Sequence, residues 1–163
     1  MRLGPQLRRH AVSFPNALRN KKGSVSMVLK PFIDSNDARQ LIDAAISAAT
    51  KEGLAMTIAV TDAAGFPFAL QRMDGAGLLT ADVALRKART AALLRAPSRA
   101  LAERVPADPA LLALTEYLPM AGGLPIKTSD GIVAGAIGVS GGTAEQDEYI
   151  GAAALAALDA THS

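Results

Sequence analysis

The sequence predicts an α+β domain in which helices flank an antiparallel sheet of four or five strands. Two pairs of β-rich stretches, each joined by a turn that contains glycine, predict two hairpins. Stretches with apolar residues at spacings of three and four predict helices before, between and after these hairpins. The order helix, hairpin, helices, hairpin, helix is the basis for the predicted class.

The composition predicts one domain with a sizeable core. The chain has 163 residues, half of them apolar, yet no apolar run approaches the roughly 18 residues that span a bilayer. Because cysteine is absent, disulfides, thiolate metal sites and a cysteine nucleophile are excluded. We therefore expect a cytoplasmic protein without membrane contacts.

The N-terminal part differs in charge from the rest. Residues 1–33 hold seven of the 17 Lys and Arg and none of the 15 Asp and Glu, so the remainder carries 10 − 15 = −5. Residues 1–26 lack helical or strand periodicity, which predicts a disordered basic extension before a single domain at 27–163. Without aromatic interleaving or a base-reading motif, we expect no nucleic-acid partner.

The first elements are a short edge strand and a helix. Met27–Phe32 predicts the strand, which Pro31 limits. Asp34 or Ser35 caps the helix and Gly53 ends it. The apolar positions of this helix are Ala38, Leu41, Ile42, Ala45, Ile46 and Ala49.

A hairpin and a second helix follow. The strands Thr57–Thr61 and Phe66–Met73 are joined by the turn at residues 62–65, and Thr80 caps a helix that runs to about Leu94. The core-facing stripe of this helix is small, so we expect it to pack closely against another small-residue face. The charged residues Arg86, Lys87 and Arg89 are placed at the helix borders.

The last third of the chain predicts two brief helices within residues 96–120, the second hairpin and a final helix. The hairpin pairs Leu124–Ser129 with Ile132–Val139 through a two-residue primed turn at Asp130-Gly131. Its second strand has a face of alanine and glycine, which is the expected partner of the small helix stripe. The final helix runs from Thr143 to about Ala160 and opens with a Thr143–Gln146 capping box.

Several motifs resemble those of the GlcG/HbpS-like family. They are VTDAAG, RMDGA, KARTAA, GGLPI, GAIGVSGG and QDE, in matching order between about Ser35 and Leu158. The resemblance implies a profilin-like fold and a homo-oligomer. It also implies an oligomeric protein that binds a small ligand, with haem or a corrinoid as the expected cofactor.

Two other functions fit the same sequence. One is a small enzyme or enzyme accessory in the metabolism of a small, glycolate-type acid, which GlcG-type members imply. The other is a scaffold without a ligand. Histidine occurs only at His10 and His162, so a Ser-His-Asp triad or a histidine metal site inside the fold has no candidates. No metal site is predicted.

The predicted ligand site brings together the charged and glycine-rich motifs. Arg72 and Asp74 leave a strand on the same side, where their side chains are expected to pair. The free N–H groups of the helix start at Ser140–Gly142 suit a carboxylate or propionate of a small anionic ligand. The residues assigned to ligand binding are Arg72, Asp74, Lys87, Gly122, Gly123, Ser140, Gly141 and Gly142.

The expected haem ligation departs from that of histidine-ligating relatives. The first helix contains no histidine where such relatives hold the iron. If haem binds, either a residue such as Met73, Thr90, Tyr117 or Met120 ligates the iron, or the haem contacts only the protein surface.

Overall fold

Two hairpins form one four-stranded antiparallel sheet. The computed structural model describes residues 30–162, and its strands are β1 (Thr57–Asp62), β2 (Pro67–Arg72), β3 (Gly123–Lys127) and β4 (Val133–Ser140). Their order across the sheet is β2-β1-β4-β3, so the hairpins meet where β1 pairs with β4. The predicted α+β class and sheet are therefore confirmed.

The fifth, edge strand expected at Met27–Phe32 does not form within its described part. The Ile33 N–H donates to the Ala134 carbonyl at 3.2 Å, but this is one isolated contact, and no strand is present between Lys30 and Ile33. The rest of that segment and the basic extension predicted at residues 1–26 lie outside the described residues.

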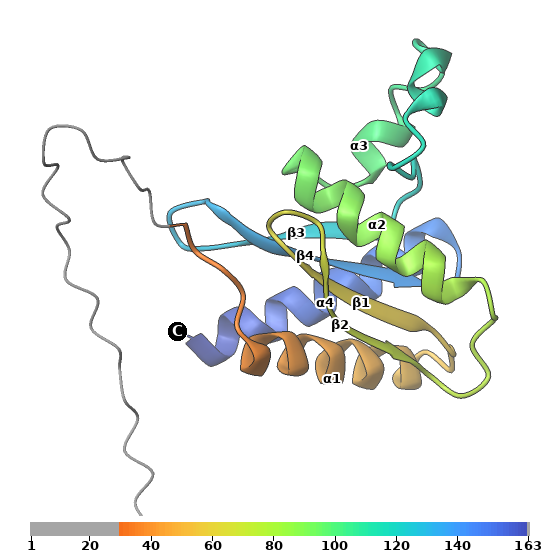
Figure 1. Ribbon diagram of the computed structural model, residues 1–163. Coiled ribbons are helices and arrows are strands. Elements are labelled where there is room, and N and C mark those ends of the chain that lie inside the picture. The colour runs from red at the N-terminus through yellow and green to blue at the C-terminus, as the bar shows by residue number, and fades with distance from the viewer. Residues whose placement is uncertain (1–29, 163) are drawn as a thin grey trace, which may run out of the picture.

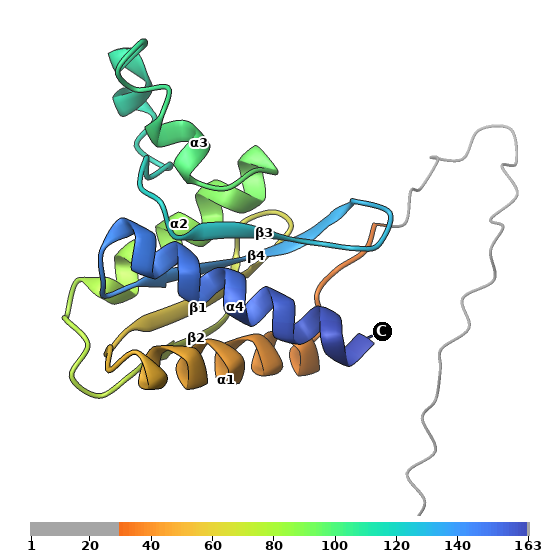
Figure 2. The ribbon, with the colours of Figure 1, turned by 180° about the vertical axis from the view of Figure 1, so that it is seen from behind.

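The helices form a layer on each face of the sheet. Helices α1 (Ser35–Lys51) and α4 (Ala144–His162) lie side by side on one face, and α2 (Thr80–Leu94) crosses the other face (Figures 1 and 2). Helix α3 (Arg99–Ala102) and the 3-10 helix η1 (Pro109–Ala113) belong to the segment between α2 and β3, residues 95–122. This segment, called the excursion below, stands away from the sheet beyond α2.

The β1–β2 turn closes as the sequence predicts. Gly65 has φ +81°, a left-handed conformation that favours glycine, and its N–H donates to the Asp62 carbonyl. The Asp62 carboxylate accepts from the N–H groups of Ala64 and Phe66, both at 2.9 Å. Asp62 therefore organises its own turn.

The β3–β4 turn corrects the predicted primed turn. Gly131 has φ +81°, but Asp130 does not adopt a positive φ, and the loop has three residues, closed by the Thr128 N–H donating to the Ile132 carbonyl. The Thr128 hydroxyl oxygen also accepts from the Ile132 N–H at 3.1 Å. This side-chain contact stabilises the longer loop, a type of hairpin that needs only one left-handed residue.

Two helix starts are as expected and one is not. The Asp34 carboxylate caps α1, and Thr143 and Gln146 form the reciprocal capping box before α4. Thr80, however, is the first residue of α2 and not its cap. Its hydroxyl donates to the Gly77 carbonyl at 2.6 Å and lies 2.7 Å from the Thr57 hydroxyl.

The expected contact between α2 and β4 is confirmed. A Cβ on Gly138 would lie 2.1 Å from the Ala84 carbonyl oxygen and 2.6 Å from the Ala88 nitrogen. Backbone therefore touches backbone at this point, and only glycine leaves room for α2.

Candidate ligand-binding site

One end of the sheet brings two of the predicted site motifs together. Thr57, at the start of β1, is the register partner of Arg72 on β2 and of Ser140 on β4. Residues in register point to the same face, so the three side chains form one row on the side of α2. Two strand spacings separate Arg72 from Ser140, roughly 10 Å.

The loop after β2 passes over this row. It leads from Arg72 to Thr80, whose hydroxyl contacts that of Thr57. Leu78 and Leu79 in this loop are 83% and 72% exposed, so the loop that begins after the exposed Arg72 carries apolar surface. This end of the sheet therefore combines a guanidinium with an open apolar surface.

The expected pairing of Arg72 with Asp74 is not made. Both side chains are exposed, and none of the ion pairs in the described part of the chain includes either residue. The Arg72 guanidinium thus faces solvent.

The glycine-rich loop, Ser140–Gly142, lies on the other side of β1 from Arg72. A Cβ on Gly141, which has φ +146°, would lie 2.7 Å from the Ala55 carbonyl oxygen. The Gly142 N–H donates to the Asp147 carboxylate at 2.9 Å, and the Thr143 N–H donates to Gln146 at 2.8 Å. The prediction of free N–H groups at Ser140–Gly142 is therefore wrong for Gly142, because Asp147 of α4 accepts from it. The Thr143 contact is the predicted capping box.

Lys87 is not at a solvated helix border. Its side chain is 1% exposed, and its ammonium donates to the Asp147 carboxylate at 2.5 Å and to the Val139 carbonyl at 3.2 Å. Since Asp147 also accepts from Gly142, this buried ion pair joins α2 and β4 to the start of α4. Lys87 thus supports the glycine-rich loop from inside the protein.

Gly122 and Gly123 make room for this ion pair. A Cβ on Gly122 would lie 3.0 Å from the Lys87 ammonium nitrogen, and one on Gly123 would lie 2.1 Å from the Lys87 carbonyl oxygen. The Gly123 N–H donates to the Ser98 hydroxyl at 2.9 Å, and that hydroxyl donates to the Met120 carbonyl at 2.6 Å. Both glycines therefore permit close packing around Lys87.

Sequence reasoning missed Asp147 and Ser98, the two side chains that complete this polar cluster. A signal for Asp147 exists, because it precedes the buried Ile150 by three positions and so falls on the core-facing stripe of α4. Lys87 falls on the α2 stripe in the same way, between Ala84 and Ala91. A Lys and an Asp on two core-facing stripes predict a buried pair.

The start of α4 also lies beside two groups with shifted pKa values, Arg99 and Glu145. Arg99 contacts Glu148 at 2.5 Å, and this hydrogen bond raises the pKa of the Arg99 guanidinium. Hydrogen bonds from its own N–H and from the Thr143 side chain lower the pKa of Glu145. Carboxylates are favoured here because the first turn of a helix carries partial positive charge.

The residues expected to ligate iron differ in availability. Thr90 is fully buried and its hydroxyl already contacts Arg86 and Leu118, while the Met73 sulfur accepts from the Met56 N–H at 3.5 Å.

Tyr117 and Met73 are half-buried and Met120 is 46% exposed, so these three reach the surface and Thr90 does not. Within residues 30–162, no group of three or more His, Cys, Asp or Glu side chains has a metal-binding arrangement.

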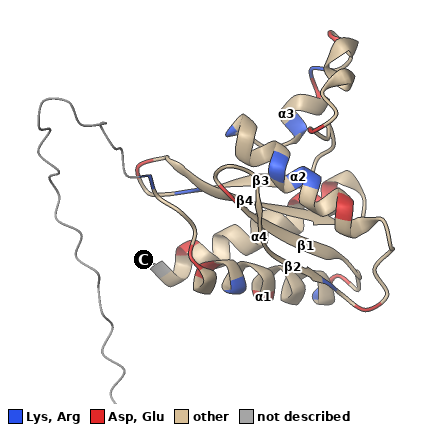
Figure 3. Cartoon of the chain, viewed as in Figure 1, with Lys and Arg blue, Asp and Glu red and all other residues tan. Residues whose placement is uncertain are grey.

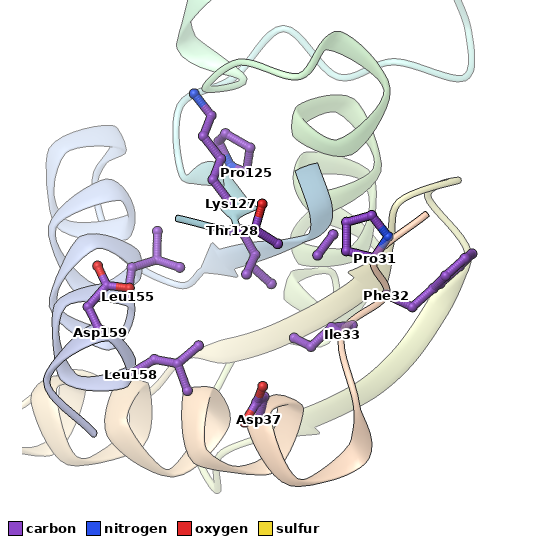
Figure 4. A pocket seen from close by; sticks show the side chains of 12 residues that line it. Pro31, Phe32, Ile33, Asp37, Pro125, Lys127, Thr128, Leu155, Leu158 and Asp159 are labelled. Atoms are coloured by element: carbon purple, nitrogen blue, oxygen red, sulfur yellow. The ribbon is translucent and has the colours of Figure 1, made fainter. Parts of the chain in front are cut away.

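A hollow of about 280 Å³ opens at the opposite end of the sheet (Figure 4). It lies between the start of α1, the end of α4 and β3, and none of the residues predicted for the site line it. Its apolar floor and acidic lining include Ile33, Ile126, Leu155, Leu158, Asp37 and Asp159.

The architecture defines a small α+β domain with one antiparallel sheet between two helical layers. The chain belongs to the HbpS-like family, described as "Haem degrading protein HbpS-like", which matches residues 33–156. This confirms the family resemblance of the sequence motifs. Among the described residues, no helix has the length and apolarity needed to cross a membrane.

Two relatives show how far the similarity extends. Protein GlcG from Escherichia coli K12 is 35% identical over 115 residues, which cover 70% of this chain and 85% of GlcG. The corrinoid adenosyltransferase PduO from Salmonella typhimurium is 32% identical over 128 residues, which cover 76% of this chain and 38% of PduO. This chain therefore corresponds to nearly all of GlcG but to well under half of PduO.

Solved structures of related proteins have the same fold as this chain. A double mutant of Streptomyces reticuli HbpS has a TM-score of 0.76 and 32% identity, covering 87% of this chain and 97% of HbpS. The PduOC–haem complex has a TM-score of 0.71 and 29% identity, covering 77% of this chain and 94% of PduOC.

Proposed function

We propose that this protein binds a tetrapyrrole, either haem or a corrinoid, at the end of the sheet that carries Arg72. The observation that carries the proposal is the likeness to PduOC, which was solved in complex with haem. The similarity to a corrinoid adenosyltransferase adds the corrinoid as the second ligand of the same class.

The chemistry of this end suits a propionate and the flat face of a macrocycle. The exposed Arg72 guanidinium offers a planar fork of donors that matches a carboxylate in two parallel hydrogen bonds. Leu78 and Leu79, with Leu70 on β2, supply exposed apolar surface nearby. Ser140, which is buried, lies across β1 from Arg72 and leads into the exposed Gly141 and Gly142, while the exposed Asp74 lies two positions after Arg72.

The residues at this end suit the propionates and the ring of haem better than they suit its iron, which needs a ligand. Lys87 is occupied by Asp147, and the accessible Met120 and Tyr117 belong to the excursion and not to the row at Arg72. Met73 directly follows Arg72, but its sulfur already accepts from the Met56 N–H at 3.5 Å. We therefore expect modest haem affinity and a visible spectrum without a bis-histidine signature. Bound haem would supply the iron centre, and the protein would hold its propionates and exclude water from one face.

Haem and cobalamin titrations followed by visible absorption test this proposal. Arg72→Ala should weaken haem binding several-fold, because it removes the propionate partner. Leu78→Ser should weaken the binding of either tetrapyrrole, because it removes apolar contact. Arg104→Ala, also an exposed arginine but on the excursion, is the matched control. Wild-type protein that binds neither tetrapyrrole would refute the proposal. Equal affinity of Arg72→Ala and wild type would refute the site.

We also propose that the protein acts as a homo-oligomer. Twelve large apolar side chains are exposed on the described part of the chain, more than isolated surface positions explain. They concentrate on edge strand β2 and its flanking loops and on the excursion, and include Phe66, Phe68, Leu70, Leu78, Leu79, Leu112, Leu114 and Met120. Light scattering should give a multiple of the 16.7 kDa chain mass at micromolar concentration, and a monomer mass would contradict this.

A further inference from the structure

A second polar hollow lies on the outer side of α2, away from the Arg72 site. It has a volume of about 270 Å³ and is bounded by α2, by the β1–β2 turn and by the segment that follows η1. Ligand pockets commonly measure about 300–1,000 Å³, so this hollow suits a small molecule and is too small for a tetrapyrrole.

Two guanidinium groups line this hollow. Arg86 and Arg89 lie three positions apart on α2 and therefore on neighbouring turns of one face. Figure 3 shows Lys and Arg positions in blue along this helix. Arg86 donates to the Thr115 carbonyl at 3.2 Å, and one terminal nitrogen of Arg89 contacts the Glu116 carboxylate at 3.2 Å.

The Arg89 guanidinium is only partly satisfied. Its Nε is buried and has no hydrogen-bond partner, although a carboxylate that approaches a guanidinium side-on uses Nε together with one terminal nitrogen. Leaving a buried donor unpaired is costly, so such a group needs an explanation. A carboxylate with freer geometry than the tethered Glu116 would satisfy both donors.

The acids at the hollow are weak competitors for an external ligand. The Glu116 side chain is 67% exposed, and Asp82, which contacts Arg86 at 3.8 Å, is 62% exposed. Water screens exposed ion pairs of this kind, so they contribute little to stability. The charges of the two arginines and the two acids cancel while Glu116 is in place. When Glu116 leaves, the hollow has a net charge of +1.

The β1–β2 turn holds Arg89 against the hollow. A Cβ on Gly65 would lie 2.8 Å from the Arg89 Cγ, so the turn contacts the stem of this side chain directly. The φ of +81° at position 65 also favours glycine over any other residue. The stem of Arg89 is therefore fixed while its guanidinium group remains free to exchange partners.

We infer that this hollow binds a small carboxylate, and that Glu116 occupies the position of the ligand carboxylate when no ligand is present. Arg89 is the main anchor, and Arg86 holds the Thr115 carbonyl and so keeps the wall of the hollow in place while Glu116 leaves. This site is independent of the proposed tetrapyrrole site, since the two share no residue.

Calorimetric titration of the full chain with malonate tests the inference. Glu116→Gln should tighten malonate binding by roughly two- to fivefold, because it removes the competing charge of an exposed pair. Arg89→Gln should abolish binding at concentrations that saturate the wild type. Arg104→Gln, an exposed arginine outside the hollow, should bind as the wild type does.

Amide chemical shifts of the wild-type protein give a readout that needs no variant. Malonate should shift the amides of Gly65, Thr115 and Glu116, whereas shifts confined to Arg72 and Ser140 would overturn the site. Unchanged affinity of Glu116→Gln would overturn the role of Glu116. Phosphate bound as tightly as malonate would overturn the carboxylate class. Equal losses in Arg89→Gln and Arg104→Gln would show non-specific attraction only.

Discussion

The two faces of the sheet are packed in different ways. On the face covered by α1 and α4, the sheet presents bulky side chains such as Ile58, Val60, Ile137 and Val139, which meet the leucine and isoleucine side chains of the helices. On the α2 face, alanine and glycine bring helix and sheet into direct contact. The α2 face also holds the buried Lys87 beside Asp147.

This difference shows that one small domain has two kinds of interior. Bulky apolar side chains share the available volume, so they can adjust to one another when one of them changes. Backbone atoms in contact cannot adjust in this way, and a buried charge requires its one partner. We therefore expect the α1/α4 face to tolerate conservative substitution and the α2 face to resist it.

The largest expected effect is at the buried ion pair. Asp147→Asn leaves the Lys87 ammonium buried without a counter-charge, and breaking a buried pair in this way costs about 3–5 kcal/mol. Urea unfolding of the variant measures the loss. The neighbouring Glu148→Gln is the control, because it breaks the partly exposed pair with Arg99 and should cost about 1 kcal/mol or less. Equal losses would mean that burial does not distinguish the two pairs.

The next effect compares one substitution on both faces. Gly138→Ala places a Cβ against the backbone of α2 and should cost about 3 kcal/mol, the upper part of the range for overpacking. Gly151→Ala in α4 places a Cβ 3.3 Å from the flexible end of Leu124 and 3.7 Å from Val139, and alanine favours the helix by about 1 kcal/mol. Thermal unfolding should therefore separate the variants, and similar melting temperatures would contradict the comparison.

A smaller effect is expected for Ile137→Val on the α1/α4 face. Ile137 is fully buried in the bulky cluster, and removal of one methylene group there costs about 0.5–1.5 kcal/mol. Chemical denaturation measures this loss directly. A loss as large as that of Gly138→Ala would show that both faces are equally rigid.

The smallest effect is a pH dependence at the start of α4. Because hydrogen bonds lower the folded-state pKa of Glu145 below its ordinary value, its stabilisation is present above that value and is lost as the pH falls through the folded pKa. The difference in urea midpoint between wild type and Glu145→Gln should therefore shrink on acidification. A difference that stays constant down to pH 3 would exclude this contribution.

Local signals were sufficient to predict most of the fold. The glycines that end both hairpin turns, the capping box at Thr143 and the small face of β4 act over a few residues, so the sequence displays them directly. The primed turn at Asp130 was wrong because the Thr128 side chain selects between two loops that both accept Asp-Gly. Such a choice depends on one side-chain contact and not on the turn dipeptide.

The site was harder to predict than the fold. Arg72 and Ser140 could be associated only through their common partner Thr57, which requires knowledge of the strand order. Lys87 lies 60 positions from Asp147, and a charged residue beside Arg86 and Arg89 resembles part of a solvated helix border. Its burial follows from long-range pairing, which neither composition nor periodicity reports.

The contact of Gly138 with α2 has a consequence beyond stability. Because backbone atoms set the distance between helix and sheet, α2 has no layer of side chains in which to shift. The position of its outer surface relative to the strands is therefore as fixed as that of its inner surface. Arg86 and Arg89 therefore project from a helix with a fixed position. Replacement of Glu116 by a ligand at Arg89 requires motion of side chains and of the segment after η1, but not of the helix.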